Sequence, residues 1–258
     1  MVTIKEIREI GQRKTREERA KESQYCIHAL RKVSPYFTKF FIEHNLSANQ
    51  ISFCSIILGS TGNFLFALGN YYLILVGCLL YQFWLLFDLV DGEIARVTNV
   101  KTLGGKYLET INEVITECGF IASLGIGLSH IHNDNAFTFI GLIFALFICL
   151  LNFFARTRDM TIEQSGRKKE KNVAPKKTLY VKRFYKKARS FFVIMNAHLV
   201  LTAIVILELI LPIKFSHRIS GETFVLNILS IYFLFYGLIW IVRTIVSSVT
   251  NYRHLMKN

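Results

Sequence analysis

The sequence is poor in charged residues, which make up only 19% of its 258 residues, whereas hydrophobic residues make up 52%. A soluble domain is typically about a quarter charged, so this composition favours a membrane protein. The apolar content also excludes intrinsic disorder. Cysteine is scarce: the five residues are an odd number without a C-x-x-C pair, which excludes a disulfide scaffold. The seven histidines show no zinc-binding spacing.

Formal charges are absent or rare in six apolar runs, each about 17–23 residues long, the length that a helix needs to cross a bilayer. The runs are Ile51–Gly69, Tyr71–Phe87, Tyr107–Ser129, Ala136–Ala155, Phe191–Ile213 and Thr223–Val242. They are too long and too uniformly apolar for the strands of a membrane barrel. We therefore predict an all-α integral membrane protein whose core is a bundle of six transmembrane helices.

Basic residues outnumber acidic ones by 31 to 18. If all six runs cross the membrane, 29 of the 31 basic residues lie on one side, and only Lys214 and Arg218 lie on the other. The positive-inside rule makes the basic side cytoplasmic, so both termini are predicted to be cytoplasmic. Topology and attraction to anionic lipid headgroups thus explain the net charge of +13, and no nucleic-acid partner is predicted.

The chain divides into three predicted regions. These are a cytoplasmic surface-helix region at 1–45, a six-helix membrane domain at 46–250 with a basic cytoplasmic loop at 156–190, and a cytoplasmic tail at 251–258. Residues 3–33 are highly charged, with Ile4, Ile7 and Ile10 at helical spacing, which indicates a helix at the membrane surface or a solvated helix. The first forty residues lack the apolar core of a signal peptide.

Acidic residues are concentrated in one short stretch. Six of the 18 fall in the segment 88–117, at the predicted cytoplasmic ends of the second and third helices: Asp88, Asp91, Glu93, Glu109, Glu113 and Glu117. The first two share a helix face by their i,i+3 spacing, and the last three share one by their i,i+4 spacing. Ionisable groups inside a membrane bundle are costly and usually functional. Oxygen-only ligands on two facing helices favour a hard cation such as Mg²⁺, Mn²⁺ or Ca²⁺.

Small residues accompany these acids. Gly92 and Ala95 leave space along the carboxylate face of the second helix, and Gly105 opens the third, so that a ligand can approach closely. Arg96 offers a planar cation for a phosphate group. Helix packing explains the small residues equally well, and a snorkelling side chain at a helix end explains Arg96.

The run from Asp88 to Glu113 resembles the signature of the CDP-alcohol phosphotransferases, D-x2-D-G-x2-A-R-x8-G-x3-D-x3-D. All spacings are met, and six of the eight signature positions carry the family residue. Glu109 and Glu113 stand where the family has its third and fourth Asp. The segment 46–52 is similar to the one that opens the first membrane helix of the family.

This resemblance implies that a phosphate-linked group passes from a CDP-activated donor, either CDP-diacylglycerol or a CDP-alcohol, to an alcohol acceptor, with release of CMP. The product would be a phospholipid or a related polar lipid. The resemblance also implies two Mg²⁺ or Mn²⁺ ions, a homodimer, and contact with membrane lipid. The site would face the cytoplasm, at the plasma membrane of a bacterium or archaeon or at an endomembrane of a eukaryote.

Individual roles are carried over by matching positions. The implied metal ligands are Asp88, Asp91, Glu109 and Glu113, and Glu113 is also the candidate catalytic base. The implied nucleotide-binding residues are Asn49, Asp88, Gly92, Ala95, Arg96 and Gly105. Arg156 and Arg158, at the predicted cytoplasmic end of the fourth helix, are a candidate acceptor site, although the positive-inside rule explains both residues as well.

Three alternatives remain open from the sequence. The first is a catalytically lapsed nucleotide-binding homologue, because Glu keeps the charge of Asp but adds one CH₂. A misplacement of about 1 Å at a reacting centre costs on the order of 100-fold in rate. The others are an intramembrane prenyltransferase and a divalent-cation transporter. A single acidic cluster argues against the former. Few polar residues in the other membrane segments argue against the latter, and we expect His198 and Glu208 to make hydrogen bonds within the bundle.

Overall fold

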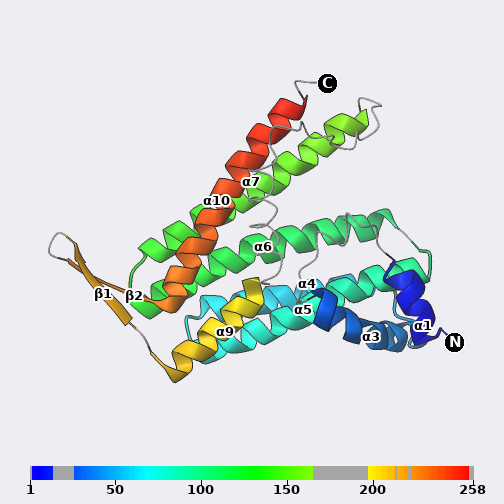
Figure 1. Ribbon diagram of the computed structural model, residues 1–258, viewed down its shortest axis with the longest axis horizontal. Coiled ribbons are helices and arrows are strands. Elements are labelled where there is room, and N and C mark those ends of the chain that lie inside the picture. Colours follow the sequence, from blue (N-terminus) through cyan, green and yellow to red (C-terminus); the bar gives the residue numbers. More distant parts are fainter. Residues whose placement is uncertain are drawn as a thin grey trace.

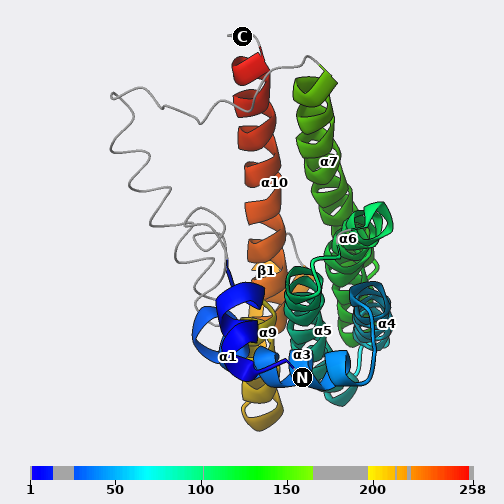
Figure 2. The same ribbon diagram turned by 90° about the vertical axis from the view of Figure 1, so that its right-hand side faces the viewer.

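A computed structural model describes residues 2–13, 26–100, 102–164, 197–212, 214–219 and 222–255 of the chain (Figure 1). Its elements are α1 (Ile4–Glu6), the π-helical turns η1 (Ile7–Gly11) and η2 (Cys26–Leu30), α3 (Arg31–Glu43), α4 (Ala48–Ala67), α5 (Tyr71–Val97), α6 (Leu103–His132), α7 (Ala136–Gln164), α9 (Ala197–Ile210), β1 (Lys214–Ile219), β2 (Glu222–Asn227) and α10 (Ile228–Leu255). The helix α4 packs against both α5 and α6, α6 packs against α7, and α7 packs against α10. In the view of Figure 2, α7 and α10 run side by side as a pair.

Side-chain caps set the starts of α4, α5 and α6. At α4, the Ser47 hydroxyl accepts the backbone N–H of Gln50, and the Gln50 side chain accepts the N–H of Ser47 at 2.9 Å. Asn70 caps α5, and Thr102 caps α6 by accepting the N–H of Gly105 at 2.9 Å. Each cap satisfies backbone donors that the first turn of a helix leaves without partners.

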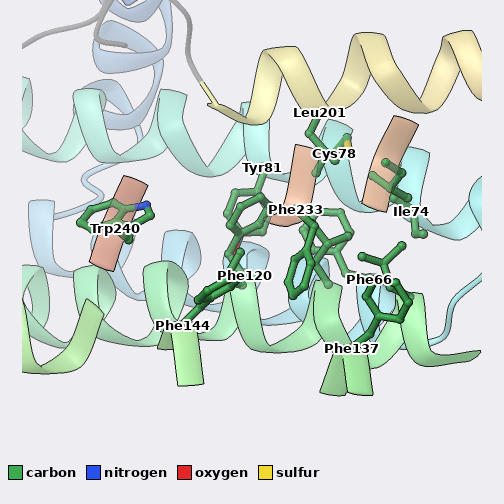
Figure 3. Packing of buried hydrophobic residues seen from close by; sticks show 14 of the residues in the cluster. Phe66, Ile74, Cys78, Tyr81, Phe120, Phe137, Phe144, Leu201, Phe233 and Trp240 are labelled. Atoms are coloured by element: carbon green, nitrogen blue, oxygen red, sulfur yellow. The ribbon is translucent and has the colours of Figure 1, made fainter. Parts of the chain in front are cut away.

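The main hydrophobic core lies where α4, α5, α6, α7, α9 and α10 meet, and aromatic rings dominate it (Figure 3). The ring centroid of Tyr81 lies 5.4 Å from that of Phe66 and 5.6 Å from that of Phe120, in the tilted arrangements that aromatic pairs favour. Because these three residues come from α5, α4 and α6, the core holds these three helices together.

Glycine brings two of these helices into backbone contact. A Cβ atom at Gly125 of α6 would lie 2.7 Å from the carbonyl oxygen of Phe137 and 2.9 Å from the Cα of Gly141, both in α7. Small residues at helix crossings allow such close approach in membrane proteins. The α6–α7 contact is therefore fixed at the far end of α6 from the acidic residues.

Five helices among the described residues are long and apolar enough to cross a membrane: α4, α5, α6, α7 and α10. They correspond to five of the six predicted runs and indicate a multi-pass membrane protein. The fifth run, Phe191–Ile213, coincides with α9, whose 14 residues are shorter than a full crossing. Residues 191–196 lie outside the described part of the chain, so the sixth crossing and the placement of the termini stay predictions.

The membrane bundle is helical, as predicted, but the connection between α9 and α10 contains a β-hairpin. Here β1 and β2 pair antiparallel, with Lys214 opposite Asn227 and Ile219 opposite Glu222. The hairpin projects from the end of the molecule opposite to α1 and α3 (Figure 1). Apolar composition alone extended the sixth predicted helix back to Thr223, but a run with Phe and Val suits a strand as well as a membrane helix.

Two side chains start α10 at Ile228 rather than earlier. The Asn227 side-chain oxygen accepts the backbone N–H of Ser230 at 2.8 Å, and the Glu208 carboxylate accepts the N–H of Leu229 at 2.7 Å. A carboxylate at a helix N-terminus also interacts favourably with the helix dipole. The hydrogen bond expected of Glu208 inside the bundle is therefore confirmed.

The N-terminal region is helical in part, but the predicted continuous helix over 3–33 is wrong. The helical turns of α1 and η1 end at Gly11, and Gln12 and Arg13 leave helical geometry. Ile7 is fully buried rather than facing a membrane surface. Both η1 and α3 pack against α5, near the loop that joins α5 to α6 (Figure 1).

Two helices continue beyond their apolar runs into the segments that are predicted to be cytoplasmic. The helix α7 extends to Gln164, so the loop predicted at 156–190 starts within it, and residues 165–190 lie outside the described part of the chain. The helix α10 extends to Leu255 and includes most of the predicted tail at 251–258. A helix can extend past the hydrocarbon core because its backbone hydrogen bonds are satisfied within the segment.

Candidate active site

A cavity of about 660 Å³ lies between α4, α5, α6 and the N-terminal segment, a volume typical of small-molecule sites. Its lining contains every signature position except Glu113: Asp88, Asp91, Gly92, Ala95, Arg96, Gly105 and Glu109. Asn49 lines it as well. The structure therefore brings together the residues predicted to bind nucleotide and three of the four predicted metal ligands.

Helical spacing explains how two helices supply most of this lining. On α5, Asp88, Gly92 and Ala95 follow one another at intervals of about one turn, which places them on one face. On α6, Gly105 and Glu109 do the same from the opposite wall. The carboxylates of Asp88 and Glu109 lie near enough to Asp91 for their charges to interact.

Asp91 is oriented by a residue from α4. The Ser52 hydroxyl of α4 donates a hydrogen bond of 2.5 Å to Oδ2 of Asp91. The Ser52 side chain is nearly buried, at 5% exposure, and lines the same cavity. One carboxylate oxygen of Asp91 is thus engaged by α4, which ties the position of the acid to the packing of α4 against α5.

Asn49 and Gly105 form a close contact across the cavity wall. The Asn49 side-chain amide donates to the Thr102 hydroxyl at 3.3 Å, and that hydroxyl caps α6. A Cβ atom at Gly105 would lie 2.9 Å from Oδ1 of Asn49, too close for an ordinary contact. A side chain at position 105 would therefore have to displace the Asn49 amide from its place in the cavity wall.

Gly92 has a similar steric role toward Arg96. A Cβ atom at Gly92 would lie 3.1 Å from Nη1 of Arg96, so the guanidinium lies along the helix where residue 92 has no side chain. Nε of Arg96 donates a hydrogen bond to the carbonyl oxygen of Gly11 in the N-terminal segment. The guanidinium predicted to meet phosphate is thus anchored through one of its nitrogens and still lines the cavity.

Glu113 lies outside the cavity lining and contacts α7 instead. Its carboxylate forms an ion pair of 3.2 Å with Arg156, whose Nη1 also donates to the Thr110 hydroxyl at 2.6 Å. The Glu113 side chain is 53% exposed. The structure therefore joins the predicted base to one of the two predicted acceptor residues. Arg158, two positions further along α7, is partly buried and does not line the cavity.

Four polar residues of the cavity lining were not predicted from the sequence: Arg13, Ser52, Thr102 and Lys106. Ser52 lies one turn after Asn49 in the segment that resembles the family, so its helix position could have indicated it. Thr102 has the cap pattern for α6, which could also have been noticed. Nothing in the sequence around Arg13 links it to a segment more than seventy residues away.

The donor set suits a hard divalent cation by its chemistry, since three carboxylates and no sulfur or imidazole line the cavity. Within the described part of the chain, no three His, Cys, Asp or Glu side chains are arranged closely enough to hold a metal ion together. The residue types fit a magnesium or manganese site, and the arrangement does not preform one.

The comparison with known families identifies the family of the chain. The sequence profile of the CDP-alcohol phosphatidyltransferases matches residues 45–251, more than half of the chain. The chain belongs to this family. No curated protein matches the sequence. As a CDP-alcohol phosphatidyltransferase family member, the protein is a membrane transferase of phospholipid synthesis, a class that moves a phosphate-linked group from a CDP-alcohol to an alcohol acceptor and generally depends on a divalent metal.

Proposed function

We propose that this family member binds the CDP part of its donor in the cavity between α4, α5 and α6 and transfers the donor's phosphate-linked group to an alcohol, releasing CMP. One observation carries the proposal: all signature positions but one line a single cavity, together with Asn49. A chance match in sequence spacing would not require these residues to line the same cavity, or that cavity to be large enough for a ligand.

In this proposal Asp88, Asp91 and Glu109 hold two Mg²⁺ or Mn²⁺ ions. The bound metal supplies charge neutralisation for the diphosphate, which makes CMP a better leaving group. Ser52 keeps the Asp91 carboxylate in one orientation through its 2.5 Å hydrogen bond. Arg96 and Lys106 add cations to the wall, where charge-assisted hydrogen bonds to phosphate are strong.

Glu113 is proposed as the general base. The acceptor hydroxyl oxygen forms a bond to the β-phosphorus of the donor, the bond from that phosphorus to the oxygen of CMP breaks, and the hydroxyl proton passes to the Glu113 carboxylate. CMP leaves with the electron pair. A base outside the nucleotide cavity suits this role, because it meets the acceptor rather than the nucleotide. Arg156 holds the carboxylate at 3.2 Å and, with Arg158, marks the proposed acceptor side.

We also propose the membrane arrangement that the charge distribution supports. Six helices cross the bilayer, both termini are cytoplasmic, and the cavity opens at the cytoplasmic face, where 29 of the 31 basic residues would lie. A lipid donor would then enter from the bilayer and a polar acceptor from the cytoplasm. A homodimer is proposed on the family relationship alone.

The proposal is tested by thermal stabilisation of the detergent-purified protein. CMP, CDP-diacylglycerol, CDP-choline, CDP-glycerol and UMP are each added with EDTA, Mg²⁺ or Mn²⁺. We expect stabilisation by cytidine ligands only with metal, and we expect Asp91→Asn to abolish it. Asp134→Asn is the matched control, because Asp134 lies in the α6–α7 connection, where it accepts the N–H of Ala136 at 2.9 Å. A response to CMP that is unchanged in Asp91→Asn would contradict the site assignment.

CMP release then separates the alternatives. Metal-dependent binding of cytidine ligands without CMP release, over a panel of alcohol acceptors, would identify a catalytically lapsed homologue. Stabilisation by prenyl diphosphates instead of cytidine ligands would favour a prenyltransferase. Metal binding without any nucleotide response, together with cation flux in proteoliposomes, would favour a transporter.

A further inference from the structure

The N-terminal segment is attached to the signature helix by one buried carboxylate. Glu93 of α5 is fully buried, and its oxygens accept hydrogen bonds from the Ser34 hydroxyl at 2.6 Å and the Thr38 hydroxyl at 2.7 Å, both from α3. Its Oε1 also accepts a hydrogen bond from Nε2 of Gln12 at 3.1 Å. Nη1 of Arg31 lies 3.8 Å from the same oxygen and forms an ion pair with it. A buried charge is tolerated only with such partners, so these elements are held together at Glu93.

A second contact holds the N-terminal segment at Gly11, the residue before Gln12. Arg96 donates to the carbonyl oxygen of Gly11, and a Cβ atom at Gly11 would lie 3.2 Å from Cγ2 of Val97. Gln12 is also held from the other side, since its Nε2 donates to the backbone carbonyl of Arg31 at 2.7 Å. Gly11 and Gln12 are therefore clamped between α5 and α3, and the chain leaves helical geometry immediately after Gly11.

The consequence is the position of Arg13. Clamping its two predecessors brings Arg13 to the wall of the 660 Å³ cavity, where it is the one N-terminal residue among the described lining residues. The lining has the carboxylates of Asp88, Asp91 and Glu109 and the cations of Arg13, Arg96 and Lys106. Because Arg96 already uses Nε for Gly11, Arg13 adds a further guanidinium to the wall, and a guanidinium can bind phosphate through two parallel hydrogen bonds.

We propose that Arg13 binds a phosphate group of the CDP-activated donor, and that Glu93 is the positioning residue that places it there through Gln12. This inference rests on the proposed function, because it assumes that the cavity takes a CDP donor. It assigns a part of the donor site to a segment that precedes the family-matched residues 45–251. The donor site is then completed only when the N-terminal segment is docked.

The test compares CDP with cytidine, which has no phosphate, in calorimetric titrations of the full-length purified protein with Mg²⁺. For Arg13→Ala we expect CDP to bind about 10- to 100-fold more weakly, the usual effect of losing a charge-assisted hydrogen bond, with cytidine affinity unchanged. Arg13→Lys should recover part of the loss. The matched control is Arg8→Ala, because Arg8 is an exposed arginine of the same segment and is absent from the cavity lining.

Three outcomes overturn the inference: CDP affinity equal to wild type in Arg13→Ala, an equal loss for CDP and cytidine, or an equal loss in Arg8→Ala. Failure of the proposed function would look different, because the wild-type protein itself would then not bind CDP. The positioning role is tested by a double-mutant cycle. Glu93→Gln should weaken the binding of CDP but not that of cytidine. Adding Glu93→Gln to Arg13→Ala should cause no further loss of CDP affinity. Additive losses would show that Glu93 does not act through Arg13.

Discussion

Ser52 of α4 and Asp91 of α5 are joined by a hydrogen bond of 2.5 Å from the serine hydroxyl to Oδ2 of the carboxylate. The two residues are 39 positions apart in sequence, and both line the candidate donor cavity. Ser52 also donates to the carbonyl of Ala48 at 3.1 Å, so its hydroxyl is shared between its own helix and the signature helix. A side chain outside the family signature therefore orients one of the proposed metal ligands.

Replacing Ser52 by Ala should weaken metal-dependent CMP binding about tenfold, because the Asp91 carboxylate loses the hydrogen bond that orients it. Titration of CMP at saturating Mg²⁺ measures the change. Thr61→Ala is the control, since Thr61 lies on the exposed side of α4, where its hydroxyl donates to the carbonyl of Ile57 at 2.8 Å. An unchanged dissociation constant in Ser52→Ala would remove Ser52 from the site.

The adjacent glycines at the start of α6 allow a matched steric test. In Gly105→Ala the new Cβ would lie 2.9 Å from Oδ1 of Asn49, whereas in Gly104→Ala the nearest atoms are 3.9 and 4.0 Å away. We expect Gly105→Ala to weaken CMP binding about tenfold through displacement of Asn49, an overpacking effect. Gly104→Ala should bind CMP normally and be no less stable, because Ala favours helix. Equal behaviour of the two variants would refute the steric role of Gly105.

We expect the position of α6 in the bundle to require the longer side chain of glutamate at the third and fourth acid positions of the signature. Shortening Glu109 to Asp restores the family residue but withdraws the carboxylate by one CH₂. We expect kcat to fall about 100-fold, as for an error of roughly 1 Å at a reacting centre. A rate of CMP release equal to or above that of the wild type would mean that catalysis does not depend on the length of the Glu109 side chain. Glu43→Asp is the control, because Glu43 lies in α3 and pairs with Lys39 at 3.7 Å.

Glu113 and Arg156 should affect turnover more than nucleotide binding. Glu113→Gln removes the proposed base, so we expect kcat to fall about 10²- to 10⁴-fold while CMP still stabilises the protein in the presence of Mg²⁺. Arg156→Ala should raise the KM for the acceptor, because the carboxylate that Arg156 holds at 3.2 Å is then free to rotate. Loss of CMP binding in Glu113→Gln would instead make Glu113 part of the donor site.

Glu208 should stabilise the bundle without taking part in catalysis. Its carboxylate accepts the N–H of Leu229 at the start of α10 and is only 6% exposed. Glu208→Ala leaves that N–H without its partner, which should cost about 1–3 kcal/mol of unfolding free energy and lower the melting temperature. Glu208→Gln keeps an acceptor and should lose less. CMP affinity should be unchanged in both variants, and a loss of affinity without destabilisation would refute the structural role.

Much of the architecture could be predicted because it depends on local patterns. Five of the six apolar runs coincide with helices of membrane-spanning length, and all signature residues except Glu113 line one cavity. The β1–β2 hairpin was missed because a Phe- and Val-containing run suits a strand as well as a membrane helix. The N-terminal helix was predicted too long because contacts with Glu93 and Arg96, far along the chain, end it at Gly11.

The sequence by itself determined the residue types, their helical spacing and the membrane setting, since a helix face and an apolar run are properties of neighbouring residues. Only the tertiary structure decided which residues complete the site. Ser52 meets Asp91, Gln12 meets Glu93 and Arg156 meets Glu113 across separations of 39, 81 and 43 residues. Such pairs arise from the way whole helices pack. No local pattern contains them, because the hydrophobic core, rather than the polar residues themselves, sets the relative position of the helices.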